Sequence, residues 1–453
     1  MGDMSFSEKA KQSRLWNPYL QKMPRKELDA MHLRRIQKLL KYAYDNTPMY
    51  RKLYDKVGLK PEDVKTWDDF YYKVPFTDKP DYLCEQAELD DQLMIPSRAG
   101  HTTKMSYYHQ TSGTTGEPLR EGYSLKDYTA FAECYAPTLW QLGIGPDDRA
   151  YFPWDFTMFM GLWSIYYACL RMGVSVYSGG GLDTKARVKQ IFTLNPTMLI
   201  GTPTYILHIV EVAGKMGLDL RKSSVRIIGG GGEAGLGLLN VKNKLLEAFN
   251  AEIVWDAYGM SEIGVHPECP EHPSEFHVME EWLHSYSIDT ETGKPLLEDG
   301  QVGENIVTSY SHSFQPFIKY RSHDLVRRYR HKEHRCGWTW EVLEGGVLGR
   351  TDQMVTIRGV NVYPTAVGSI LSQTEGVSIH YELHVNKVEE MDHMTIKFEV
   401  IQDFPADSYH LLEEKIAFIC KEKIGVRFAV EAVAPGSLPR YEIKSKRFFD
   451  HRH

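Results

Sequence analysis

The spacing of hydrophobic residues near the start of the chain predicts a long amphipathic helix. Leu33, Ile36, Leu40 and Ala43 recur at intervals of three or four residues, and Asn46-Thr47-Pro48 ends the pattern. This period places apolar side chains on one helical face, and proline rarely continues a helix. The first eighty residues are therefore expected to be mainly helical.

Between residues 125 and 260, short apolar runs alternate with helix-like segments. The runs lie at 149–152, 174–177, 198–200, 225–228 and 252–256; each is followed by turn residues and then a helix, with helices expected at 127–142, 161–172 and from 184 onward. Such alternation predicts a parallel sheet with βαβ crossovers. Ligands bind such sheets at the carboxyl ends of the strands, where the glycine-rich loops fall.

Two changes in pattern follow. Beyond residue 280 the chain turns to short strands, with Thr292-Gly293 and Asp299-Gly300 as hairpin signals. Past 349–352, strand pairs accompany helices at 365–373 and 408–422, which predicts a small α+β domain of about a hundred residues. The fold class is therefore α/β, with a large N-terminal domain of βαβ units, a β-rich subdomain and a small C-terminal domain.

Composition narrows the function classes. A chain of 453 residues is too long for one core, and 42% hydrophobic with 25% charged residues excludes extended disorder. The net charge of −7 argues against a nucleic-acid partner. No apolar run is long enough for a membrane span, and the first residues lack a signal-peptide pattern. Six scattered cysteines favour a reducing cytoplasm over a disulfide framework.

The segment from Thr111 to Pro118, TSGTTGEP, is the most informative. Alternating glycines and hydroxyl residues let backbone N–H groups and side-chain hydroxyls approach an anion. The spacing differs from that of the GxxxxGK[ST] phosphate loop, and a flexible surface turn is the alternative.

The full string resembles the phosphate loop of the adenylate-forming enzymes, a superfamily of acyl- and aryl-CoA ligases, adenylation domains and luciferases. Four further segments resemble that superfamily in the same order: 256–262 (DAYGMSE), 320–324 (YRSHD), 349–355 (GRTDQMV) with 358–364 (RGVNVYP), and 439–447 (PRYEIKSKR). The segments LWNP at 15–18, NTPMYR at 46–51 and VPFTDK at 74–79 are most similar to the phenylacetate–CoA ligase branch.

The resemblance implies that ATP activates an aromatic carboxylic acid to an acyl-adenylate with release of pyrophosphate, after which the thiol of coenzyme A displaces AMP. The alternatives are transfer to an amine or to a carrier-protein thiol, and a non-catalytic nucleotide-binding regulator. Partners are then the aryl acid, ATP and the acceptor; a homodimer stays open. The implied cofactors are ATP and Mg²⁺, with coenzyme A as co-substrate.

The resemblance also assigns roles by position. Lys444 is the catalytic lysine, Glu262 holds magnesium, Asp324 binds the ribose and Asp352 is the hinge between residues 1–349 and a mobile lid at 353–453, with 350–352 as the joint. The nucleotide-binding set is Thr111, Ser112, Gly113, Thr114, Thr115, Gly116, Gly232, Glu233, Ala234, Asp256, Ala257, Tyr258, Gly259, Met260, Ser261, Asp324 and Arg350.

One residue departs from the family pattern. The phosphate loop of the family carries lysine after TSGTTG, whereas this chain has Glu117, which cannot pair with phosphate. Either Glu117 points away from the nucleotide or another cation, such as Arg120, takes the place of the lysine.

Two further clusters suggest ligands. Some branch members have a structural zinc, which here implies Cys269, His277, His334 and Cys336 as ligands, with His272 as a competitor for His277. The alternative is ordinary buried histidines and thiols. The aromatic loop with Trp154, Phe156 and Phe159 lies where the branch places its acid pocket and suits an aryl acid, with a histidine or Asp155 as candidate readers of a ring substituent.

Overall fold

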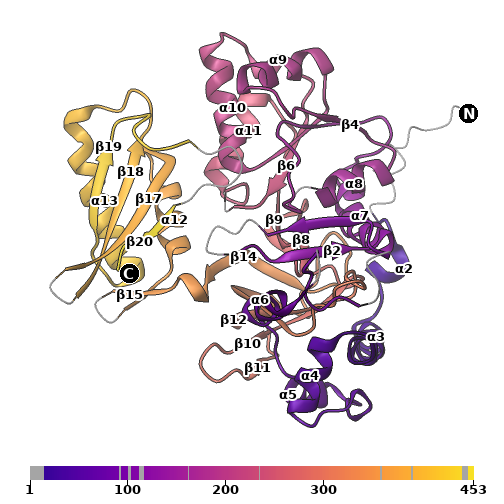
Figure 1. Cartoon of the computed structure of the whole chain (residues 1–453). Helices are drawn as coiled ribbons and strands as arrows, with labels where there is room; N and C mark the ends of the chain where they lie inside the picture. Colours follow the sequence, from indigo (N-terminus) through magenta and orange to yellow (C-terminus); the bar gives the residue numbers. More distant parts are fainter. Residues whose placement is uncertain are drawn as a thin grey trace, which may run out of the picture.

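The chain forms a large α/β body with a smaller C-terminal unit beside it (Figure 1). The computed structural model describes residues 15–90, 93–99, 104–111, 117–161, 163–233, 235–357, 360–388, 391–440 and 447–452. None of the helices in these ranges is long and apolar enough to cross a membrane.

Helices build the N-terminal part, as the sequence predicts. They are α2 (Pro18–Gln21), α3 (Arg25–Asn46), α4 (Pro48–Lys56), the 3-10 turn η1 (Pro61–Asp63), α5 (Trp67–Lys73) and α6 (Lys79–Glu88). In α3 the predicted apolar face is buried at Ile36, Leu40 and Ala43. Pro48 then occupies the first turn of α4, where its missing N–H costs nothing.

Five parallel strands form the middle of the body. They are β3 (Arg149–Phe152), β4 (Ser175–Ser178), β5 (Met198–Gly201), β6 (Ile227–Gly231) and β7 (Ile253–Met260), in the order β4-β3-β5-β6-β7. The connecting helices are α8 (Trp163–Arg171), α9 (Thr184–Leu194), α10 (Pro203–Lys215) and α11 (Leu239–Phe249), and α7 (Leu125–Gln141) precedes β3.

Both faces of this parallel sheet are covered. Met198 and Ile200 point into one hydrophobic core, whereas Leu199 and Ile228 point into another. Burial on both faces explains why these strands are short continuous apolar runs rather than alternating ones. The predicted parallel sheet is confirmed.

One predicted helix is wrong. The run at 252–256 is not followed by a helix, because β7 continues to Met260 and turns at Ser261–Ile263 into the antiparallel strand β8 (Gly264–Cys269). Turn residues after a strand indicate only that the strand ends, and they fit an antiparallel return as well as a crossover.

The β-rich part extends the same sheet to twelve strands. After β8 come β9 (His272–His277), β10 (Leu283–Ile288), β11 (Pro295–Leu296), β12 (Val302–Ser309), β13 (Tyr320–Tyr329) and β14 (Val342–Arg350). The order in the sheet is β7-β8-β9-β14-β13-β12-β10-β11, so β14 lies between β9 and β13.

The C-terminal unit has a hydrophobic core of its own. It comprises η4 (Thr351–Gln353), β15 (Val355–Ile357), β16 (Val360–Val362), α12 (Pro364–Gln373), β17 (Val377–Val388), β18 (Met391–Val400), η5 (Ala406–Ser408), α13 (Tyr409–Ile424), β19 (Ala429–Val433) and β20 (Phe448–Asp450). The predicted fold class, a large α/β part followed by a small α+β domain, is confirmed.

Candidate active site

A cavity of about 640 Å³ opens where the parallel strands end. Trp154 follows β3, Thr202 follows β5 and Gly232 follows β6, so three neighbouring strand ends supply one wall. The predicted site residues that line the cavity are Thr111, Trp154, Phe156, Phe159, Gly232, Ala257, Gly259, Met260, Ser261, Glu262, Arg350 and Asp352. The structure thus joins segments that are 240 residues apart in sequence.

The phosphate-loop candidate lies between two strands, β1 (Tyr107–Gln110) and β2 (Arg120–Tyr123), which pair antiparallel. Thr111 and Leu119 close the loop, since Thr111 N donates to Leu119 O and Leu119 N donates to Thr111 Oγ1. Ser112, Gly113, Thr114, Thr115 and Gly116 lie outside the described residues, as do Ala234 and Lys444.

A lysine that the sequence analysis assigned no role stands beside this loop. Lys79, the first residue of α6, lines the cavity, and its Nζ donates to Thr111 Oγ1 at 3.3 Å. Arg120, the predicted substitute cation, is on β2 and is not among the described residues that line the cavity. Glu117 is exposed and accepts from Gln86 Nε2 at 3.4 Å. Glu117 also lines the cavity, and Lys79 is the described lysine that lies next to Thr111 there.

Glu262, which lines the cavity, has a second buried carboxyl group, that of Glu121, as its neighbour. Burial raises the pKa of Glu262, and burial followed by the nearby Glu262 raises that of Glu121 well above its usual range. Tyr320 donates to Glu262 at 3.3 Å, and Tyr123 donates to Glu121 at 3.1 Å. Lys79 counteracts both shifts. A divalent cation at this position would favour the ionised carboxylate, so Glu262 fits a hard metal such as Mg²⁺.

The adenine and ribose candidates form a second layer. Tyr258 Oη donates to Asp324 Oδ2 at 2.7 Å, while Arg350 Nη1 donates to Asp324 Oδ1 at 2.9 Å. Arg350 also makes a two-pronged ion pair with Asp352 at 2.9 and 2.7 Å. One guanidinium therefore links the ribose candidate to the hinge candidate. Burial raises the pKa of Asp324.

Two predicted nucleotide contacts are engaged elsewhere in this structure. Glu233 accepts from the backbone N–H of Thr204 at 2.9 Å and lies 4.0 Å from Arg447 of the C-terminal unit. Asp256 is buried, and burial raises its pKa to about 8. Its neighbour Ala257 lines the cavity.

The other half of the cavity is aromatic. Trp154, Phe156 and Phe159 are joined there by four residues that the sequence analysis did not single out for this pocket: Phe131, Tyr135, Met160 and Ser164. Phe131 and Tyr135 lie one turn apart on α7 and so share a face. Asp155 lines the rim, but its carboxylate accepts from Gly181 N and faces Arg187 at 3.6 Å.

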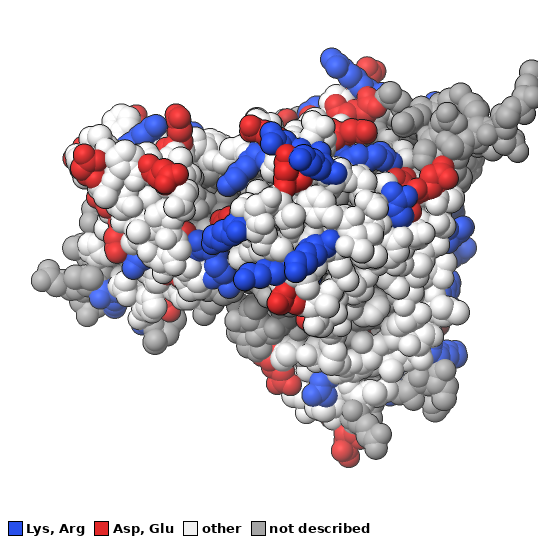
Figure 2. Space-filling model, turned by 90° about the horizontal axis from the view of Figure 1, so that it is seen from above, with Lys and Arg blue, Asp and Glu red and all other residues white. Residues whose placement is uncertain are grey.

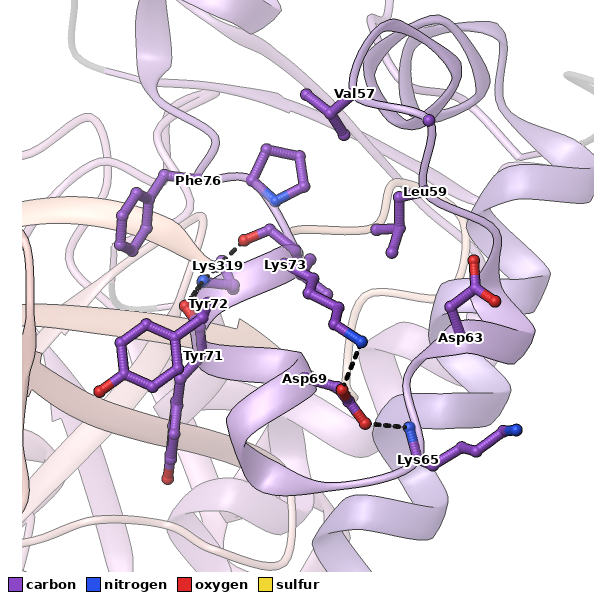
Figure 3. A pocket seen from close by; sticks show the side chains of 13 residues that line it. Val57, Leu59, Asp63, Lys65, Asp69, Tyr71, Tyr72, Lys73, Phe76 and Lys319 are labelled. Carbon is purple, nitrogen blue, oxygen red and sulfur yellow. Dashed lines mark hydrogen bonds and ion pairs between the residues drawn. The ribbon is translucent and has the colours of Figure 1, made fainter.

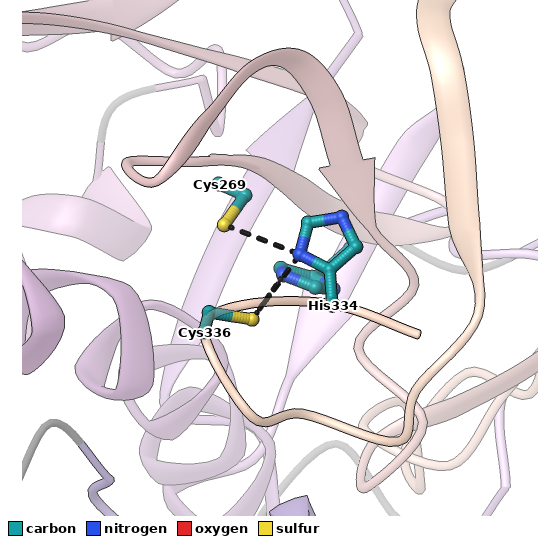
Figure 4. Close-up of side chains that lie close together, drawn as sticks. Cys269, His334 and Cys336 are labelled. Carbon is teal, nitrogen blue, oxygen red and sulfur yellow. Dashed lines mark hydrogen bonds between the residues drawn. The ribbon is translucent and has the colours of Figure 1, made fainter. Parts of the chain in front are cut away.

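The predicted metal ligands come together in one buried cluster (Figure 4). Ligand atoms of Cys269, His277, His334 and Cys336 lie within 4.8 Å of one another, and all four residues are buried. Cys336 Sγ is 3.3 Å from His334 Nδ1 and 3.4 Å from His277 Nε2, and Cys269 Sγ is 3.7 Å from His334 Nδ1. Zinc–ligand bonds of about 2.0–2.3 Å require tetrahedral edges of about 3.3–3.8 Å.

Residues around this cluster also fit a metal site. His334 Nε2 faces the carboxylate of Glu275, as expected for a carboxylate that orients a ligating imidazole. His272, the competing candidate, instead accepts from the backbone N–H of Arg335 at 3.3 Å.

A second hollow, of about 840 Å³, lies near α5 and contains none of the predicted site residues (Figure 3). Its base includes Lys319, whose Nζ donates to the carbonyls of Phe70, Tyr71 and Val74 at 3.2, 2.7 and 2.7 Å. Three carbonyl acceptors match the three donors of an ammonium at the end of a helix. Lys319 immediately precedes β13, so we assign it a structural role, holding α5 against the strand that carries Asp324.

Charge gathers locally despite the net charge of −7. Seen from above, Lys and Arg side chains form a band across the large body beside the smaller unit (Figure 2). Exposed lysines on the helices of this part include Lys185 and Lys189 on α9, Lys215 on α10 and Lys244 on α11. A basic face of this kind raises the local concentration of anions.

Comparison with known proteins agrees with this geometry. Residues 34–311 match the family model of AMP-binding enzymes, and residues 359–452 match that of the AMP-binding enzyme C-terminal domain. The phenylacetate-coenzyme A ligase of Thermus thermophilus is 30% identical over 94% of this chain and 97% of its own length. That of Escherichia coli is 30% identical over 94% and 95%.

Solved structures give the same result. A 2-hydroxyisobutyryl-CoA ligase in its postadenylation state, with R3-HIB-AMP, is 27% identical and has a TM-score of 0.89 over 97% of this chain and 93% of its own. The same ligase with 2-HIB-AMP and CoA in the thioesterification state is 28% identical over the same shares and has a TM-score of 0.72. The chain belongs to the family of AMP-binding enzymes, in the branch of the phenylacetate–coenzyme A ligases.

Proposed function

We propose that the protein joins an aromatic carboxylic acid to coenzyme A in two steps driven by ATP. The supporting observation is a single cavity lined by Thr111, by the magnesium candidate Glu262 and by Arg350 on one side and by an aromatic chamber on the other. The phenylacetate specificity of the relatives and the CoA bound to the related ligase support the same acid class and acceptor. Six free thiols fit a reducing cytoplasm.

In the first step, a carboxylate oxygen bonds to the α-phosphorus of ATP and the bond to pyrophosphate breaks. Two anions must approach, so the chain has to supply positive charge and oriented donors. We assign Lys79 and the loop at 111–116 to the phosphates, and Lys444 to the space between carboxylate and α-phosphate. Magnesium held by Glu262 would offset phosphate charge.

In the second step, the sulfur of coenzyme A bonds to the acyl carbon and AMP leaves. We propose that residues 353–453 turn relative to residues 1–349 about 350–352 between the steps. The Arg350–Asp352 ion pair would hold the joint in the present arrangement, which resembles a postadenylation state more than a thioesterification state. An amine or a carrier-protein thiol remains the alternative acceptor.

Pyrophosphate exchange over a panel of aryl acids tests the first step. We expect exchange with at least one acid, and mass spectrometry should then show its CoA thioester rather than an amide. Lys444→Ala should lower exchange about 100-fold or more while circular dichroism stays unchanged. Lys446→Ala is the matched control and should keep its activity. Absence of exchange with every acid would favour the nucleotide-binding regulator.

We further propose that the Cys269–His277–His334–Cys336 cluster binds one structural zinc ion, because its donors and spacing suit tetrahedral coordination. Protein purified without nickel should contain about one equivalent of zinc by mass spectrometry. Cys336→Ser should lose the metal and melt at a lower temperature, whereas the exposed Cys84→Ser should keep it. A wild-type protein with well under one equivalent would contradict the proposal.

A further inference from the structure

Three buried hydroxyl groups line the aromatic chamber of the cavity. Tyr135, Ser164 and Thr202 all line it, and their exposed fractions are only 6%, 5% and 7%. They come from three separate elements, since Tyr135 is on α7, Ser164 on α8 and Thr202 at the end of β5. Apolar binding pockets obtain their specificity from a few polar groups placed in this way.

The hydroxyl of Thr202 is the least satisfied of the three. Its Oγ1 is buried without a hydrogen-bond partner among the described residues. Thr202 precedes α10, where a threonine often caps the helix, yet its side chain makes no capping bond. A buried hydroxyl without a partner is costly, which indicates that a ligand supplies one.

Tyr135 and Ser164 form a pair. Burial raises the pKa of the Tyr135 phenol and outweighs the opposing effect of the nearby Ser164 side chain, so the phenol stays protonated. Each hydroxyl carries one O–H donor and lone pairs, so the two can both donate to a ligand and accept from it. The ring of Trp255 lies 6.0 Å from that of Tyr135 between centroids.

The residues considered from sequence as readers of a substituent are occupied. The Asp155 carboxylate is bound to Gly181 N, and His323, the one described histidine that lines the cavity, is paired with Asp78 at 2.9 Å. Among the described residues that line the chamber, the three buried hydroxyls are therefore placed to bind a polar atom on the acid.

From this placement we propose that the acid is an aryl acid that carries an oxygen substituent, a ring hydroxyl, and that Tyr135, Ser164 and Thr202 select it. The inference rests on the proposed function and specifies its substrate class. An aromatic ring would stack among Trp154, Phe156 and Phe159, while the substituent exchanges hydrogen bonds with the hydroxyls. An acid without that oxygen would leave them unsatisfied, which lowers its affinity.

Phenylacetic acid and its three ring-hydroxylated isomers serve as probes. Binding of each acid is measured by calorimetry, and kcat/KM by pyrophosphate exchange. The wild type should favour one hydroxylated isomer over phenylacetic acid about tenfold or more in both. Tyr135→Phe and Thr202→Val should each reduce that ratio several-fold.

Tyr166→Phe is the matched control. Tyr166 is on α8 within the same group of rings, 5.0 Å from Phe156, but it is not among the described residues that line the cavity. It should leave the ratio unchanged. A wild type that prefers phenylacetic acid, or variants that lower all acids equally, would overturn the inference. Either result would leave the proposed ligase function intact. If instead an acid binds but no acid supports exchange, the proposed function would be refuted and the inference about acid recognition would not.

Discussion

Replacing Lys79 by methionine tests the electrostatics of the phosphate site directly. The side chain keeps its length but loses its charge, so the position beside Thr111 Oγ1, 3.3 Å from Nζ, no longer attracts an anion. A hydrogen bond from a charged donor contributes about 1.5–3 kcal/mol, which corresponds to about 10- to 150-fold in affinity. We therefore expect KM for ATP to rise by about that factor.

The same substitution should also change the demand for magnesium. Lys79 lowers the pKa of Glu262 and of Glu121, so its loss raises both. A larger fraction of Glu262 is then protonated at neutral pH, and a protonated carboxyl is a poor metal ligand. The Mg²⁺ concentration needed for half-maximal pyrophosphate exchange should therefore be higher in Lys79→Met than in the wild type. As the pH is raised, Glu262 loses its proton and the concentration needed by the variant should decrease.

A second substitution separates this role from a general loss of fold. Glu117→Lys restores the lysine that the family carries in the loop, and in the Lys79→Met background it should recover ATP affinity at least tenfold. Lys52→Met, at an exposed position of α4, is the control and should behave as wild type. Unchanged KM for ATP in Lys79→Met, or a loss that Glu117→Lys does not relieve, would refute the assignment.

Two further predictions concern stability. His266 is fully buried with a pKa lowered to about 3 by burial, so between pH 6.5 and 3 the unfolded state binds more protons and stability falls as pH falls. His266→Phe should therefore reduce the slope of the unfolding free energy against pH, measured with urea, by about 0.7 kcal/mol per unit at pH 6.5 and by about 1.4 kcal/mol per unit at pH 4.5, and an unchanged slope would contradict this. Gly230→Ala places Cβ 1.7 Å from Gly201 O and should destabilise by about 3 kcal/mol or more, whereas Gly214→Ala, with open space in α10, should stabilise by about 0.5–1 kcal/mol. Equal melting temperatures for the two alanine variants would contradict the close backbone contact between β5 and β6 at Gly230.

The fold follows from sequence wherever the pattern is local. The runs at 149–152 and 198–200 became β3 and β5 because their residues are apolar without interruption and fill cores on both sheet faces. The turn after Met260 was misjudged because its residues do not reveal which strand comes next in space. Residue order likewise does not show that β14 lies between β9 and β13.

Some residues of the candidate site could likewise be predicted from sequence, whereas others were found only in the structure. Glu262 and Arg350 could be found from sequence because they lie in segments that resemble the motifs of a known family. Both line the same cavity in the structure. Lys79 stands in a segment that was matched only as a marker of the branch, and its contact with Thr111 spans 32 residues. Tyr135 was missed because an aromatic residue on an apolar helix face has the same pattern whether it packs or faces a cavity.

The position of β14 sets an order of assembly during synthesis. Its residues Val342–Glu344 pair with Glu275–His277 of β9, and its other edge pairs with β13. Until residue 350 leaves the ribosome, the half of the sheet that ends in β9 and the half that ends in β13 have no strand between them. Because β14 ends in Arg350, pairing of this strand also puts Arg350 into the wall of the cavity. A nascent chain stalled before residue 342 should therefore expose two open sheet edges, which makes it a natural client of chaperones.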